Sequence, residues 1–199
     1  SQAFIAAVSR LAPKIPVFYY PNSVDKDFYT PRKLDAPHID SLTSGFTVLF
    51  AGNVGEAQSM ETIISAAKNL LAYPEIKIVI IGSGSKIDWV REEIKEKSLG
   101  NIFLEGRYPV QVMPSLMRMA SVLLVSLTDQ PIFSLTVPNK IQAYLAVGRP
   151  IIASLNGEGA RIVNEARAGL SVPAEDAEGL ALAILKMYRM TDGERLQLG

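Results

Sequence analysis

Short apolar runs alternate with segments of helical periodicity along most of this 199-residue chain. Apolar runs that are typical of buried strands occur at 46–51 (FTVLFA), 77–81 (KIVII) and 122–126 (VLLVS), with further strands expected at 102–104, 150–154 and 170–172. Apolar residues at helical spacing predict helices over 60–73, 86–98, 113–120, 138–147, 158–167 and 176–190. Strands of this kind separated by helices predict an α/β fold, a mainly parallel sheet with helices on both faces.

The expected sheet also predicts where a ligand binds. Open parallel sheets bind ligands at the carboxyl ends of their strands, in the crevice where the strand order reverses. Gly52, the turn at 82–84, Arg107 and the turn at 138–140 each follow an expected strand. We therefore expect these residues to gather at one edge of the sheet.

Composition excludes several classes of function. Twenty basic residues balance twenty acidic ones, so no broad field for nucleic acid is expected. The chain has no cysteine and one histidine, His38, which makes a zinc site or a nucleophilic triad improbable. No apolar run approaches the ~20 residues that span a bilayer, and no signal peptide begins the chain. We expect a cytoplasmic protein whose membrane contact, if any, is peripheral at the inner face.

The first 45 residues differ from the rest. Phe4 to Leu11 is a short helical candidate, and Val17 to Tyr20 is a strand candidate. Residues 31–45 combine prolines, Gly45 and polar side chains, which predicts a surface loop. We therefore divide the chain into a leading segment, 1–45, and an α/β domain, 46–199.

Two turns have the composition of a phosphate site. The turn Pro138-Asn139-Lys140 opens a helix, where proline is preorganised, free N–H groups attract anions, and a lysine adds charge. The turn after the first strand, GNVGEAQ, has Gly52 and Gly55 for close backbone approach, although it is neither a G-x-G-x-x-G nor a Walker A motif. These glycines, and Gly82, could equally be turn residues. Arg107 could bind phosphate, stack on a base or make a surface salt bridge.

The segment PNKIQAYLAVGRP, together with GNVGEAQ, resembles a known signature. It is similar to P-S-K-x-x-x-Y-x-A-x-G-x-P in the bacterial polysaccharide branch of family 4 (group 1) retaining glycosyltransferases, which have the GT-B fold. The resemblance covers most of the chain and implies the C-terminal, donor-binding half of such an enzyme, a Rossmann-like domain.

The resemblance also implies roles for single residues. Asn53 and Gln58 stand where the wider family has an arginine and a lysine that grip the diphosphate, so Lys140 becomes the expected source of charge. Gly82 matches a family G-x-G turn, and Arg107 lies beside the expected base pocket. Lys140 and Arg107 are thus the expected catalytic pair, which neutralises the departing diphosphate.

Further contacts are expected from the segment before and inside the 138–147 helix. The backbone of Thr136 and Val137 would hold the donor sugar and phosphate, with Pro138 and Asn139 at the helix start. Ala143 replaces a family glutamate that holds the ribose hydroxyls, and Gln142 or backbone would replace that contact.

The implied function is transfer of a hexose-type sugar from a nucleotide diphosphate, most simply a UDP-sugar, to an acceptor such as a lipid-linked saccharide. No metal or other cofactor is implied. The family's amino-terminal domain is an expected partner that this chain lacks, so we expect no activity from the chain alone. A non-catalytic nucleotide-binding module stays open as an alternative. A nucleotide-sugar epimerase is disfavoured because residues 131–155 contain no acid.

Overall fold

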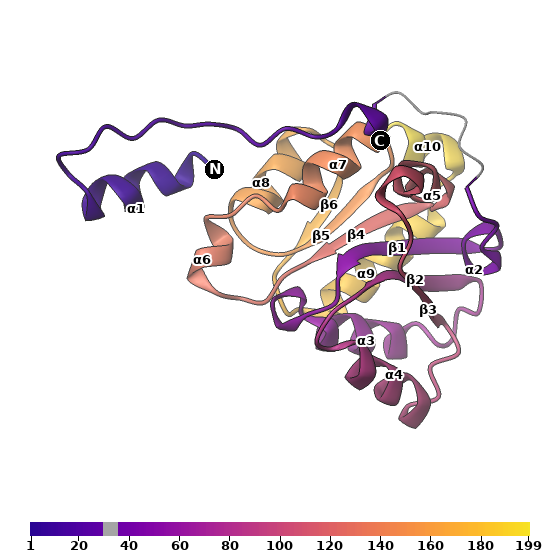
Figure 1. The fold of residues 1–199 in the computed structure, drawn as a ribbon. Helices are drawn as coiled ribbons and strands as arrows, with labels where there is room; N and C mark the ends of the chain where they lie inside the picture. Colours follow the sequence, from indigo (N-terminus) through magenta and orange to yellow (C-terminus); the bar gives the residue numbers. More distant parts are fainter. Residues whose placement is uncertain (30–35) are drawn as a thin grey trace.

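The computed structural model describes residues 1–29 and 36–199 and contains one parallel sheet of six strands in this part of the chain (Figure 1). The strand order is β3-β2-β1-β4-β5-β6, and every neighbouring pair runs parallel. The strands are β1 (Phe46–Asn53), β2 (Ile76–Ser83), β3 (Ile102–Gly106), β4 (Val122–Ser126), β5 (Ile151–Ser154) and β6 (Gly169–Val172). The predicted Rossmann-like α/β class is confirmed.

Helices cover both faces of the sheet, as the alternating pattern predicted. Alternate side chains of each strand point to opposite faces, so Val48 and Phe50 enter one core and Leu49 enters the other. The first face is covered by α3 (Met60–Asn69), α4 (Ile87–Glu96) and α9 (Ala177–Arg189). The second is covered by α2 (Asp40–Thr43), α5 (Met113–Met119), α7 (Asn139–Val147) and α8 (Glu158–Glu165).

Shorter helices complete the chain. These are α1 (Ala3–Leu11), α6 (Pro131–Ser134) and α10 (Asp192–Leu196), with single 3-10 turns at Lys26–Phe28, Glu56–Gln58 and Val110–Val112. The predicted helix at the amino terminus is confirmed as α1. Within the described residues, no helix has both the length and the apolar character needed to cross a bilayer.

Two predictions for the leading segment are wrong. Residues 17–20 form no strand, because no neighbouring strand pairs with them, and Phe18 and Tyr20 are exposed. The predicted loop contains α2, whose Leu42 is buried against the sheet, and Ile39 just before it is buried too. The part of that loop at 31–35 lies outside the described residues. Ile39 and Leu42 belong to the core on the second face of the sheet, so this part of the segment is held by contacts with the strands.

The strand order creates a crevice beside β1. β1 pairs with β2 along its whole length, from Phe46 to Asn53, but pairs with β4 only from Val48 to Phe50. The connections turn to opposite sides of the sheet at this point, and the two strands separate toward their carboxyl ends. A parallel sheet of this order binds ligands at such a position.

Candidate functional site

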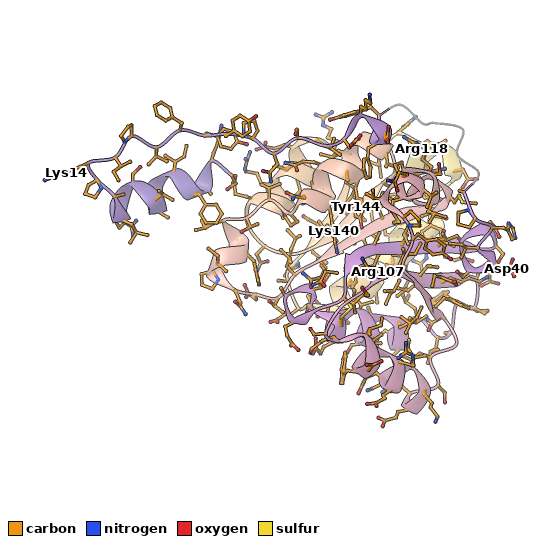
Figure 2. The ribbon with its side chains drawn as sticks, viewed as in Figure 1. Lys14, Asp40, Arg107, Arg118, Lys140 and Tyr144 are labelled. Atoms are coloured by element: carbon orange, nitrogen blue, oxygen red, sulfur yellow. The ribbon has the colours of Figure 1, made fainter. Side chains whose placement is uncertain are left out.

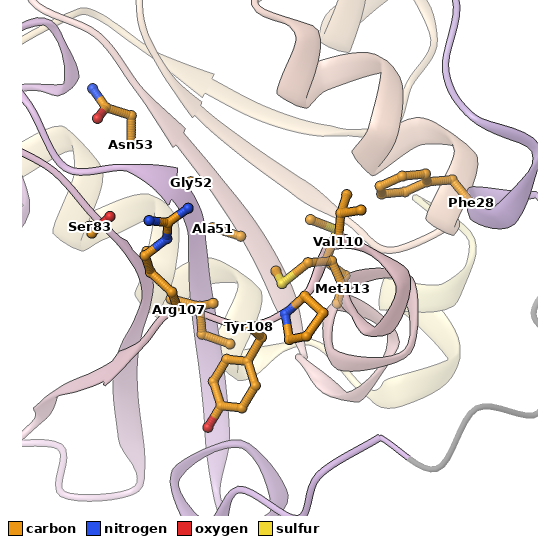
Figure 3. Close-up of a pocket in the computed structure, with 13 residues that line it drawn as sticks. Phe28, Ala51, Gly52, Asn53, Ser83, Arg107, Tyr108, Val110 and Met113 are labelled. Atoms are coloured by element: carbon orange, nitrogen blue, oxygen red, sulfur yellow. The ribbon is translucent and has the colours of Figure 1, made fainter.

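A cavity of about 580 Å³ opens at the carboxyl edge of the sheet (Figure 3). It lies where β1, β2 and β3 end, and the turn into α5 and the 3-10 turn at Lys26–Phe28 close its other side. The residues that line it are Phe28, Ala51, Gly52, Asn53, Ile81, Gly82, Ser83, Arg107, Tyr108, Pro109, Val110, Met113 and Met117. Four of the predicted site residues, at the strand ends, are therefore brought together.

Glycines allow the strand ends to come close. Gly82 has a φ of +153°, and a Cβ on it would stand 1.8 Å from the carbonyl oxygen of Gly52. Gly52 has a φ of +132°, and a Cβ there would stand 2.6 Å from Cε of Lys140. Any larger residue at either position would both strain the backbone and fill the crevice. Close packing against protein atoms thus requires glycine at 52 and 82, and close approach of a ligand to their backbone stays a prediction.

Lys140 reaches into the crevice from the first turn of α7. Its Nζ lies 3.7 Å from the centroid of the Phe50 ring, next to the backbone of Gly52. Within residues 1–29 and 36–199 no acidic group lies within ion-pair distance of this ammonium, and it makes no hydrogen bond there. Burial without an anionic partner lowers the pKa of Lys140 from 10.5 to about 7. The crevice therefore holds a desolvated cation whose electrostatic partner would be a ligand.

The start of α7 adds backbone donors to this cation. Pro138 is the N-cap, and no side chain caps the first turn of the nine-residue helix. Uncapped N–H groups at a helix start attract anions. The Asn139 side chain is engaged elsewhere, since its Oδ1 accepts a hydrogen bond of 2.6 Å from Nδ2 of Asn22. The leading segment thus contacts the helix that carries Lys140.

The turn after β1 is closed by its own side chains. Oε1 of Gln58 accepts a bond of 2.9 Å from Nδ2 of Asn53 and one of 3.1 Å from the Gly55 N–H. These bonds use the Gln58 oxygen and the Gly55 donor within the turn. Asn53 also lines the cavity, whereas Gln58 shapes the turn.

Arg107 supplies a second cation at the cavity wall. It follows β3, is exposed, and directs its guanidinium toward the end of β1 beside Gly52 in Figure 3. No ion pair with an acidic residue of the described chain holds it. Apolar and sulfur-containing side chains form the wall beyond it, with Val110 and Met113 next to Phe28. Of the roles left open for Arg107, the salt bridge is not observed.

Eight of the twelve predicted site residues do not line the cavity: Gly55, Gln58, Thr136, Val137, Pro138, Asn139, Lys140 and Gln142. Lys140 lies beside it, against Gly52 and Phe50. The hydroxyl of Thr136 donates to the carbonyl oxygen of Ile132 at 2.7 Å, and Val137 lies in the turn before α7. Gln142 carries a buried Oε1 that has no hydrogen-bond partner among the described residues. Their roles as ligands stay predictions. Conversely, Phe28 at the cavity and Phe50 beside Lys140 could not be predicted as site residues, because neither belongs to a polar motif.

The chain also matches known proteins. A family model described as "Glycosyl transferases group 1" covers residues 45–190. The chain belongs to the group 1 glycosyltransferases. A probable glycosyltransferase, WbjE of Pseudomonas aeruginosa, is 30% identical over 176 residues, which are 86% of this chain and 44% of that protein. A phosphatidyl-myo-inositol mannosyltransferase of Mycolicibacterium smegmatis is 30% identical over 168 residues, 83% of this chain and 41% of that protein. This glycosyltransferase chain thus spans less than half the length of these relatives.

Solved glycosyltransferase structures share the fold. The C-terminal domain of the group 1 protein LpcC from Francisella tularensis has a TM-score of 0.66 at 17% identity, with 88% of this chain and 92% of that one covered. Staphylococcus aureus TarM, solved with UDP, has a TM-score of 0.65 at 17% identity over 84% of this chain and 32% of that one. The predicted resemblance to the group 1 glycosyltransferases is confirmed, and the fold matches that of a C-terminal domain from this family.

Proposed function

We propose that this glycosyltransferase domain binds a nucleotide-diphosphate sugar, a UDP-sugar in the first instance, for retaining transfer of the sugar to an acceptor. The observation that carries the proposal is the unpaired ammonium of Lys140 beside Gly52, at the point where β1 and β4 separate. A diphosphate seated there would meet Lys140, the N–H groups of α7 and the guanidinium of Arg107. Backbone N–H groups and two cations are the donors that a phosphate site uses.

The chemistry of this half of the enzyme is stabilisation of the leaving group. As the glycosidic bond to the nucleotide breaks, negative charge grows on the diphosphate, and preorganised cations stabilise it most in a site that excludes water. Lys140 and Arg107 would do this without a metal ion. The apolar cavity wall from Val110 to Met117 would take the nucleoside.

Two observations on relatives support the choice of donor and acceptor. TarM and the pneumococcal O-GlcNAc transferase GtfA were both solved with UDP. One curated relative is named for a lipid acceptor, phosphatidyl-myo-inositol. A UDP-sugar donor and a lipid-linked saccharide acceptor therefore remain our proposal. Because the chain covers under half of its relatives, we also propose that acceptor binding and turnover need the family's other domain.

The test is a thermal and calorimetric titration of the chain with UDP, UMP, GDP, dTDP and ADP. A nucleotide at 100 times its dissociation constant adds about 2.7 kcal/mol to the free energy of unfolding. For a domain of this size that raises Tm by about 5–10 °C. We expect a rise with UDP and a much smaller one with UMP, because the second phosphate would make most of the contacts with Lys140.

The matched variants are Lys140→Met and Lys68→Met. Lys68 lies on the exposed side of α3, so its variant removes the same charge away from the cavity. We expect Lys140→Met to weaken UDP binding about 10- to 100-fold, the range for a charge-assisted hydrogen bond. Equal affinity of the wild type for UMP and UDP, or an unchanged UDP affinity in Lys140→Met, would contradict the proposal that the diphosphate binds at Lys140.

A further inference from the structure

One buried hydroxyl in the crevice has no part in the chemistry above. Tyr144 is fully buried under the sheet, four residues after Lys140 and on the same side of α7 (Figure 2). Its oxygen accepts a hydrogen bond of 3.2 Å from the Ala51 N–H. The same hydroxyl lies 3.3 Å from the carbonyl oxygen of Leu124 and 3.4 Å from that of Ala51, as the donor. It therefore bonds to both strands that border the crevice.

The hydroxyl lies at the end of the ladder between β1 and β4. The β1–β4 ladder ends at the pair Phe50 and Leu124. In a parallel ladder that pair already includes the bond from the Ala51 N–H to the Leu124 carbonyl, so the next hydrogen bond would run from the Ser126 N–H to the Ala51 carbonyl. The hydroxyl of Tyr144 lies beside the Ala51 carbonyl as well as the Ala51 N–H, so it occupies the end of the ladder, where that next bond would form.

The hydroxyl coincides with the end of pairing on one side of β1 only, the side that faces β4. Beyond Phe50, β1 continues its pairing with β2 through Gly52 and Asn53, whereas it makes no further pair with β4. The side chain of Lys140 passes beside Gly52 to the Phe50 ring in the space that this separation leaves. Without the hydroxyl, the Ala51 carbonyl would either pair with the Ser126 N–H, which would extend the β1–β4 ladder, or stay buried with an unsatisfied lone pair, which is costly.

We propose that Tyr144 is a positioning residue that holds β1 and β4 apart. It thereby fixes the place where the Lys140 side chain contacts the donor diphosphate. The donor part of this inference rests on the proposed function. The separation of the strands does not, because it is built into the free protein. Burial also raises the pKa of Tyr144, so its hydroxyl remains a neutral donor and acceptor at the pH of the cell.

The test compares Tyr144→Phe with Val147→Ala. Phenylalanine keeps the ring and removes the hydroxyl, whereas Val147 is a buried residue of the same helix whose truncation loosens packing without touching the crevice. Two quantities are measured in each protein: the titration of the Lys140 side chain by NMR without ligand, with the signal assigned by Lys140→Met, and the affinity for UDP.

We expect Lys140 in Tyr144→Phe to titrate at higher pH than in the wild type, because its ammonium leaves the desolvated seat. UDP affinity should fall at least tenfold in that variant, and both quantities should stay within twofold, or 0.3 pH units, in Val147→Ala. A Tyr144→Phe protein with the wild-type titration and the wild-type affinity would overturn the proposal, as would equal losses in both variants.

The failure of the proposed function gives a different result. If the wild type does not bind UDP, that function fails and the Lys140 titration alone decides the role of Tyr144. If Tyr144→Phe does not fold, the wild type is examined for a slowly exchanging hydroxyl proton of Tyr144 with a cross-peak to the Ala51 amide proton. Its presence supports the inserted hydrogen bond, and its absence overturns it.

Discussion

Replacing Lys140 with methionine should change how the stability of this domain depends on pH. The folded protein holds this lysine at a pKa of about 7, against 10.5 for an ordinary lysine. Between these two values the unfolded chain binds a proton that the folded chain does not. The free energy of unfolding of the wild type therefore rises with pH through this window, by up to ~1.4 kcal/mol per pH unit. Methionine has a similar length and no charge, so Lys140→Met lacks this contribution.

The structure sets the size of the effect. A pKa lowered from 10.5 to about 7 corresponds to as much as ~5 kcal/mol of destabilisation by the charged form. Below pH 7 the wild type carries the whole of this cost, and the methionine variant should be the more stable protein. At pH 9 the advantage of the variant should have shrunk by up to ~3 kcal/mol.

The assay is urea unfolding of both proteins at pH 6, 7, 8 and 9, in the absence of nucleotide. Lys68→Met is the control, because Lys68 is exposed on α3 and its replacement should give a difference that does not vary with pH. A constant difference between the wild type and Lys140→Met from pH 6 to pH 9 would refute the claim that the crevice holds a desolvated, unpaired ammonium.

Three further predictions concern the ligand. At pH 8, UDP binding should take up close to one proton per site, since a diphosphate restores the charged form of Lys140; calorimetry in buffers of different ionisation enthalpy measures this, and uptake near zero would contradict it. Arg107→Gln should weaken UDP binding by roughly 10- to 100-fold while Arg107→Lys keeps part of the affinity, and loss of affinity for UMP as well as UDP would instead place Arg107 at the nucleoside. Gly52→Ala should destabilise the fold by about 1–3 kcal/mol and abolish UDP binding, because its Cβ would displace Lys140; a well-folded variant with normal affinity would be contrary to this.

Much of the fold was readable from the sequence because strands and helices here have distinct hydrophobic periods. The run at 122–126 coincides with β4, and Gly148, with a φ of +71°, ends α7 where its position predicted. The leading segment was harder to predict, since its apolar residues have no local period that distinguishes exposed Tyr20 from buried Leu42. Whether such residues are buried depends on contacts with distant elements.

The site was predictable where single residue types are physically required. Glycine is required at 52 and 82 because neighbouring protein atoms leave no room for a side chain. A lysine at the start of α7 adds positive charge where helix N–H groups already attract anions. The bond that closes the turn between Asn53 and Gln58 could not be read from the motif, because both residues were equally suited to contact a ligand. The role of Phe50 was hidden too, since an aromatic residue inside an apolar strand looks like any other core residue.

We infer that the positive charge which the turn after β1 lacks is supplied by Lys140 on α7. In the wider family an arginine and a lysine stand at the positions of Asn53 and Gln58, and a cation at 53, directly after Gly52, would lie near an ammonium that already lacks a partner. Like charges at short distance disfavour the charged forms of both, so a basic turn and Lys140 would weaken each other. Asn53→Arg with Gln58→Lys should therefore gain little UDP affinity in the wild type but recover at least tenfold in a Lys140→Met background. The double-mutant comparison is made by calorimetry at one pH and ionic strength. Equal gains in UDP affinity in the two backgrounds would show that the turn and Lys140 act independently. Lys140 would then not substitute for positive charge in the turn.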